Sequence, residues 1–225
     1  MLHPLFPLTL RGVIWYQGES NAAKPTNYPL LMQTLAAEWR AKFNAPELPF
    51  LMVLVAPYKK TGPEIREAQM CAARLVPHAD IVNTLDIGAA EDIHPPHKRP
   101  VGERLALLAR RHVYGETNLV TSGPRFAGAT FAEGKATVRF TDLGGGLTTT
   151  GDVLKGFTLA GADGKFIPAE ARIEGDTVVV SAPGLTAPTA VRYGWASVPD
   201  ASLDSLAGLP AFPFRSDGET FTIIY

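Results

Sequence analysis

One segment near the start of the chain combines residue types that could stabilise a negatively charged reaction intermediate. Residues 15–21 read Trp-Tyr-Gln-Gly-Glu-Ser-Asn and directly follow a short apolar run. Gln17 can donate hydrogen bonds from its side-chain amide, and Gly18 lets the backbone approach a ligand closely. An oxyanion hole needs both properties, because its donors must face the oxygen that gains charge in the transition state. The segment therefore predicts an acyl-transfer site.

A second segment offers a general base. Residues 91–95 read Glu-Asp-Ile-His-Pro. Histidine is the natural proton acceptor near neutral pH, and an acid just before it can orient the ring and stabilise the imidazolium. His94 is thus a candidate base, with Asp92 or Glu91 as its partner. A surface histidine with acidic neighbours is the non-catalytic alternative.

The same residues also allow two other interpretations. The sequence Gly-Glu-Ser-Asn-Ala around Ser20 is similar to a G-x-S-x-G nucleophile elbow, which needs a strand, a sharp turn and a helix. Pro25 follows here with no helix start, so Ser20 as nucleophile stays an alternative, beside a loop whose polar residues only cap backbone groups. A metal site formed by His94 and His97 with the nearby acids is disfavoured, because Pro95-Pro96 prevents a helix from aligning the histidines.

The first half of the chain alternates apolar runs with helical spacings. We expect buried strands at residues 12–16, 48–56 and 81–87, and helices at 28–39, 63–75 and 101–113, the last of them ended by Gly115. This alternation predicts an α/β fold with a parallel sheet covered on both faces. Functional sites in such sheets form beyond the carboxyl ends of the strands, where both candidate segments fall.

The second half of the chain follows a different pattern. Short alternating runs at residues 136–140, 157–160, 169–173 and 177–180 are separated by glycine-containing turns, which predicts an antiparallel β domain. We place the boundary near residues 116–123. The predicted domains are the α/β part at residues 1–117 and the β domain at residues 118–225.

Composition excludes several classes of protein. The 225 residues include 46% hydrophobic residues and carry a formal net charge of -1, and Lys and Arg form no basic stripe, so a nucleic-acid partner is not expected. No apolar stretch approaches the roughly 18 residues of a membrane span, and Cys71 alone cannot form an internal disulfide. The start of the chain lacks the features of a signal peptide and runs almost at once into a strand, which predicts that the sequence is part of a longer protein.

Several motifs together resemble the sialate O-acetylesterase group of the SGNH hydrolases. Residues 11–21 are similar to one sequence block of that group, residues 65–69 (Ile-Arg-Glu-Ala-Gln) to its helix motif, and residues 92–95, followed by Lys98, Val101-Gly102 and Arg104-Leu105-Ala106, to its terminal catalytic block. Residues 156–157, 160–161, 191–195, 208–211 and 213–215 resemble its C-terminal β region. The resemblance covers nearly the whole chain, with the motifs in the family's order.

The resemblance implies a fold, an activity and roles for the site residues. The fold would be a three-layer, flavodoxin-like SGNH-hydrolase sheet, incomplete at its N-terminus and followed by an antiparallel β domain. The substrate would be an acetylated sugar, such as O-acetylated sialic acid or decorated plant polysaccharide, with no cofactor and no metal. His94 would be the base, Asp92 the acid that orients it, and Gln17 the oxyanion donor. The family also implies a periplasmic or secreted protein.

Two features depart from the family pattern. The nucleophilic serine of the family lies in a Gly-Gln-Ser-Asn type motif well upstream of the Trp-Tyr-Gln-Gly-Glu block, but only ten residues precede the matching segment that starts at Arg11, and none of them is serine. The general family spacing places the acid three residues before the histidine, at Glu91, whereas the sialate esterase group prefers the Asp-Ile-His arrangement and so Asp92.

Three hypotheses remain from the sequence. The leading one is the C-terminal portion of a carbohydrate acetylesterase, whose missing N-terminal half would be its partner. The second is a catalytically inactive truncated product or a sugar-binding relic, in which Tyr193 and Trp195 could stack on sugars, although such residues more often fill a core. The third is an esterase that acts through Ser20.

Overall fold

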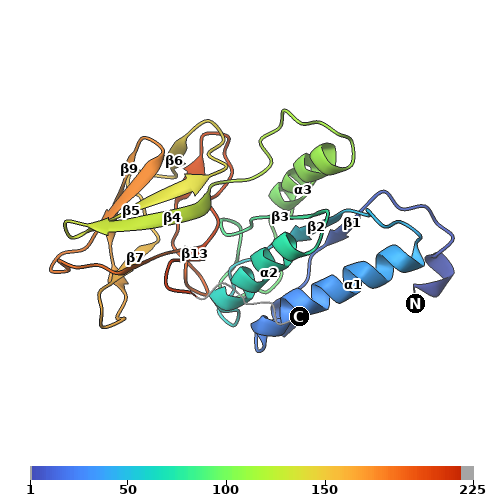
Figure 1. Cartoon of the computed structure of the whole chain (residues 1–225), viewed down its shortest axis with the longest axis horizontal. Helices are drawn as coiled ribbons and strands as arrows, with labels where there is room; N and C mark the ends of the chain where they lie inside the picture. Colours follow the sequence, from blue (N-terminus) through green and yellow to red (C-terminus); the bar gives the residue numbers. More distant parts are fainter. Residues whose placement is uncertain (1, 219–225) are drawn as a thin grey trace.

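A computed structural model describes residues 2–218 of the chain. Its first part is a three-stranded parallel sheet of β1 (Val13–Trp15), β2 (Phe50–Val53) and β3 (Ala79–Val82), in the order β1-β2-β3. Three helices accompany the sheet: α1 (Tyr28–Lys42), α2 (Pro63–Leu75) and α3 (Arg99–His112). Figure 1 shows α1 and α2 on one side of the strands and α3 on the other. The predicted parallel α/β sheet is confirmed, but the strand predicted at residues 12–16 is not buried as expected: β1 is the end strand of the described sheet, and its Ile14 is 65% exposed.

The central strand explains why both faces are covered. All four residues of β2 are buried. Successive side chains of a strand point to opposite faces, so Phe50 and Met52 pack with α1 and α2, whereas Leu51 and Val53 pack with α3. A strand that is apolar at every position can satisfy all its side chains only between two layers of helices.

The third strand was predicted too far along the chain. It spans Ala79–Val82 rather than residues 81–87. After Val82, side-chain hydrogen bonds take the place of strand pairing. The side-chain amide of Asn83 donates to the carbonyls of Pro210 and Ala211, and Thr84 Oγ1 donates to the carbonyl of Leu54. These contacts tie the start of the loop that leads to His94 to Leu54 and to the β region.

The remaining described residues form antiparallel β structure, as predicted. The strands are β4 (Arg125–Ala132), β5 (Lys135–Thr141), β6 (Leu147–Thr149), β7 (Phe157–Ala160), β8 (Ile167–Pro168), β9 (Glu170–Glu174), β10 (Thr177–Ser181), β11 (Ala190–Tyr193), β12 (Leu203–Ser205) and β13 (Phe214–Arg215). They pair in the orders β4-β5-β10-β9, β13-β11-β7-β8 and β12-β6. The sequence pattern missed β4, β6, β8, β11, β12 and β13. In β4 a register shift between Phe126 and Gly128 interrupts the alternation.

Tyr193, one of the two aromatic residues considered for sugar stacking, lies in the core of the β region. Tyr193 is 1% exposed and packs among Leu159, Val178 and Val191. Its hydroxyl accepts a hydrogen bond of 2.9 Å from the backbone N–H of Leu203. Tyr193 is therefore a core residue and cannot stack on a sugar.

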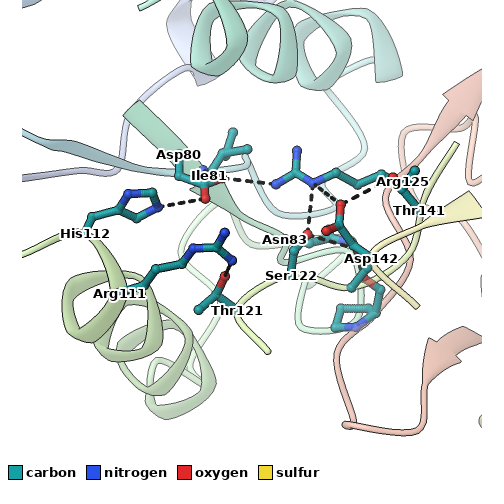
Figure 2. A network of polar contacts seen from close by, with 12 residues as sticks. Asp80, Ile81, Asn83, Arg111, His112, Thr121, Ser122, Arg125, Thr141 and Asp142 are labelled. Atoms are coloured by element: carbon teal, nitrogen blue, oxygen red, sulfur yellow. Dashed lines mark hydrogen bonds and ion pairs between the residues drawn. The ribbon is translucent and has the colours of Figure 1, made fainter. Parts of the chain in front are cut away.

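A polar network joins β3, α3 and β4 (Figure 2). The carboxylate of Asp80 on β3 lies 3.1 Å from Nε2 of His112 on α3, and it accepts a hydrogen bond of 3.1 Å from Arg125 on β4. The guanidinium of Arg125 also lies 3.6 Å from a carboxylate oxygen of Asp142 and stacks over the ring of Phe212. The network spans the connection between α3 and β4, within which the predicted boundary between residues 117 and 118 falls.

Candidate active site

Gln17 and its neighbours form a loop directly beyond the carboxyl end of β1. The loop continues as a 3-10 turn at Glu19–Asn21, and a second 3-10 turn at Pro25–Asn27 leads into α1. The side-chain amide of Gln17 donates a hydrogen bond of 2.7 Å to Oδ1 of Asn21. An amide nitrogen carries two hydrogens, so this bond fixes the orientation of the group and leaves its second N–H to donate elsewhere.

Side chains of α1 and α2 bind the backbone of this loop. The carbonyl of Gln17 accepts hydrogen bonds of 2.9 Å from the hydroxyl of Tyr28 and 2.9 Å from Nε2 of Gln69. The hydroxyl of Tyr28 in turn accepts a bond of 3.3 Å from Nε1 of Trp15. These contacts join the loop to β1, to the start of α1 and to α2.

The acid and the serine of the loop have distinct surroundings. Glu19 accepts a hydrogen bond of 3.1 Å from the backbone N–H of Gly18, so its carboxylate braces its own loop. Ser20 is exposed within the 3-10 turn, and no side-chain hydrogen bond joins it to His94 in residues 2–218. The helix that a nucleophile elbow needs begins only at Tyr28, which agrees with the argument against Ser20.

Tyr16 is partly buried and packs against the apolar cluster of β2 and α3. Burial, and secondarily the negative charge of Glu19, raises the pKa of Tyr16 to about 12. The hydroxyl therefore stays protonated at neutral pH and can act as a hydrogen-bond donor. The ammonium group of Lys98, just before α3, lies 5.2 Å from the centre of the Tyr16 ring, so the end of the His94 loop contacts the Gln17 loop.

His94 lies in the loop between β3 and α3 and is largely exposed. Its backbone N–H donates a hydrogen bond of 2.8 Å to Oδ1 of Asp92, and the same oxygen lies 3.8 Å from Nδ1 of the ring. Glu91 is instead paired with Lys59 from the loop after β2. Of the two acids, Asp92 is therefore the one beside the imidazole, with Nδ1 of the ring toward it.

Two further contacts position the loop that carries His94. The guanidinium of Arg104 on α3 binds both carboxylate oxygens of Asp86 and the carbonyl of Asn83. Gly88 packs against Pro57 so closely that an added Cβ would lie 2.4 Å from Cδ of the proline ring. Any side chain at Gly88 would force apart the loops that follow β2 and β3.

A cavity of about 300 Å³ adjoins these loops. It lies between the exits of β2 and β3 and the β region, and its lining includes Pro57, Asp86, Gly88, Thr150 and Asp204. Thr150 donates a hydrogen bond to Asp204, and burial raises the pKa of the Asp204 carboxyl. Among residues 2–218, no three His, Cys, Asp or Glu side chains converge as metal ligands.

The structure adds residues that sequence reasoning did not assign to the site. From the sequence, Gln69 and Arg66 belong only to a helix motif, and Arg104 only to the terminal block. A polar residue on the buried face of an amphipathic helix was the available signal, because such a group must have a hydrogen-bonding partner. The pattern alone does not say where that partner lies.

Comparison with known proteins identifies the family of the first part. The sequence pattern of the family described as "Carbohydrate esterase, sialic acid-specific acetylesterase" matches residues 3–110. Residues 3–110 belong to this family. The match contains both candidate segments, and it confirms the family resemblance drawn from residues 11–21 and 92–95.

Individual members of this group extend the comparison. The sialate O-acetylesterases of Mus musculus and Homo sapiens are each 35% identical to the chain over 147 residues, which is 55% of this chain and 27% and 28% of theirs. The crystal structure of a carbohydrate acetylesterase from Xanthomonas citri superposes with a TM-score of 0.90 at 43% identity, and the match covers 97% of this chain and 53% of that one. The chain thus spans about a quarter of its curated relatives and about half of its solved neighbour.

Proposed function

We propose that the chain carries the general base and the oxyanion site of a carbohydrate acetylesterase. The observation that carries this proposal is the placement of Gln17 and His94 beyond the carboxyl ends of β1 and β3, which flank β2 in one parallel sheet. This edge is where open α/β sheets bind their ligands. The family match and the names of the relatives support an acetylated sugar as substrate.

The proposed reaction is serine-type ester hydrolysis. With Asp92 beside Nδ1, Nε2 of His94 takes the proton of a serine hydroxyl as the serine oxygen attacks the acetyl carbon. The carbonyl oxygen becomes an oxyanion and accepts a hydrogen bond from the Gln17 amide. The bond to the sugar then breaks, and the imidazolium of His94 protonates the sugar oxygen. Water attacks the acetyl-serine by the same route and releases acetate.

We propose that the nucleophilic serine comes from a segment upstream of residue 1. The family places it in a Gly-Gln-Ser-Asn type motif ahead of the Trp-Tyr-Gln-Gly-Glu block, and residues 1–14, which precede that block, hold no serine. The upstream half would then be the partner of this chain. A periplasmic or secreted location is part of the same proposal. Within residues 2–218, no helix is both long and apolar enough to cross a membrane.

Hydrolysis of 4-nitrophenyl acetate tests this arrangement. The chain by itself should react no faster than its His94→Ala variant, because loss of the nucleophile removes several orders of magnitude in rate. Joined to an upstream segment with the serine motif, it should release acetate from acetylated sugars. Turnover of the chain alone that disappears in Ser20→Ala would overturn the upstream nucleophile, and no acetate release by the joined protein would overturn the function.

A non-catalytic sugar-binding role has less support. Tyr193 is buried in the core, and the half-buried ring of Trp195 has the guanidinium groups of Arg192 and Arg215 at 5.8 and 5.0 Å from its centre. An aromatic face covered by arginine is not open to a sugar ring. The observations therefore favour the esterase.

A further inference from the structure

Helix α2 directs two fully buried polar side chains toward the candidate site. Arg66 and Gln69 lie about one helical turn apart, and each is 0% exposed. The backbone N–H of Val55 donates a hydrogen bond of 2.8 Å to Oε1 of Gln69, and Nε of Arg66 donates one of 3.1 Å to the carbonyl of Val55. Both backbone polar groups of Val55, just beyond β2, are thus bound by side chains of one helix.

Gln69 also holds the loop that contains the predicted oxyanion donor. Its Nε2 donates to the carbonyl of Gln17 at 2.9 Å and lies 3.4 Å from the carbonyl of Val53. Because a peptide bond is planar, a fixed carbonyl at Gln17 fixes the plane of the peptide that it shares with Gly18. A Cβ on Gly18 would lie 2.6 Å from Nε2 of Gln69, so this contact requires glycine.

Arg66 connects α2 to the backbone of the β region. Its two terminal nitrogens donate hydrogen bonds of 2.7 Å to the carbonyls of Ala196 and Ser197. Burial lowers the pKa of Arg66 to about 10, so the group stays charged at neutral pH. Burying a charge is costly, and the negative charge of Glu64 only partly opposes the effect of burial on the pKa of Arg66. A planar guanidinium can bind three carbonyls in fixed directions, which a lysine cannot do.

We propose that Arg66 and Gln69 are positioning residues for the oxyanion site, and that the Ala196–Ser197 backbone is part of this support. Gln69 fixes the orientation of the peptide bond between Gln17 and Gly18. Arg66 holds the backbone of Val55 against α2, and the carbonyls of the β region fix the guanidinium of Arg66. The β region would then act in catalysis through the orientation of the Gln17 loop. This inference rests on the proposed function.

The test compares Gln69→Met with Glu67→Gln as a matched control. Methionine is similar in length to glutamine but makes none of the hydrogen bonds of Gln69. Glu67 lies on the same helix and binds Arg215 of the β region at 3.0 and 2.8 Å, without contact to the Gln17 loop. Two measurements are made: hydrogen exchange of residues 16–22 by mass spectrometry in this chain, and kcat and KM for an acetylated sugar in the protein joined to its upstream serine segment.

Gln69→Met should speed exchange in residues 16–22 and lower kcat by about 10²-fold with KM within about 2-fold, because small misplacements of a catalytic group are costly. Arg66→Lys should act in the same direction. Glu67→Gln should change neither exchange in this segment nor kcat. Unchanged exchange in Gln69→Met, or equal losses of kcat in Gln69→Met and Glu67→Gln, would overturn the positioning role.

The two measurements also separate this inference from the function on which it rests. If the joined protein releases no acetate, the proposed esterase activity fails. Faster exchange of residues 16–22 in Gln69→Met and Arg66→Lys, but not in Glu67→Gln, would still show that α2 positions the Gln17 loop. Unchanged exchange in Gln69→Met and Arg66→Lys would overturn that role.

Discussion

The guanidinium of Arg104 forms a bidentate ion pair with the carboxylate of Asp86, at 2.7 and 2.6 Å. The arginine side chain is 10% exposed and the aspartate side chain 39%. Arg104 comes from the helix after the His94 loop and Asp86 from the start of that loop, so the pair closes the loop at its base. The proposed general base therefore depends on a contact between residues that flank it in sequence.

Removing this ion pair should destabilise the chain. Arg104→Met leaves the Asp86 carboxylate and the Asn83 carbonyl without their donors and should cost about 2 kcal/mol in the free energy of unfolding. Urea denaturation measures the change. The control is Arg99→Met on the same helix, whose pair with Glu103 is largely exposed and screened by solvent, so this variant should lose much less stability. Equal losses from the two variants would contradict the role of the pair.

The two acids before His94 should differ in importance. In the protein that includes the upstream serine, Asp92→Asn should lower kcat by roughly 10²-fold or more, because an amide can hold the wrong imidazole tautomer. Glu91→Gln should change kcat by less than about 2-fold, since that carboxylate pairs with Lys59 in an exposed ion pair. A large loss only in Glu91→Gln would assign the orienting role to the other acid.

Gln17 should act on the transition state. Gln17→Ala should lower kcat by roughly 10²-fold with little change in KM, because the substrate oxygen becomes strongly negative only in the tetrahedral intermediate. Glu19→Gln, by contrast, should shift the melting temperature more than kcat, since its carboxylate binds the backbone of its own loop. A normal kcat with a raised KM in Gln17→Ala would remove Gln17 from the oxyanion site.

The single cysteine should react slowly in the folded chain. Cys71 is 3% exposed, and burial raises the pKa of its thiol. A raised pKa lowers the fraction of reactive thiolate at pH 8, and burial limits access, so iodoacetamide should label the native thiol at least about 10-fold more slowly than the denatured one. Mass spectrometry over time measures both rates. Equal rates would mean that α2 does not bury this residue.

The local pattern of the sequence was sufficient for most elements that carry the site. The helix predicted at residues 63–75 and the strand at 157–160 have the predicted bounds, and the apolar run at 48–56 contains the buried strand β2. Burial periodicity and proline placement are local properties, so they can be read without the fold. The order of strands and loops also placed Gln17 and His94 at the same edge of the sheet.

The sequence by itself determined the α/β and antiparallel β classes, the two loops of the candidate site and the family resemblance. Only the tertiary structure decided which residues hold those loops. Gln69 lies 52 positions from Gln17, and Arg66 lies 130 positions from Ala196. Contacts over such separations depend on how the layers pack, which no local pattern specifies. The family resemblance already favoured Asp92 over Glu91 as the partner of His94, and the tertiary structure adds that Glu91 pairs with the distant Lys59.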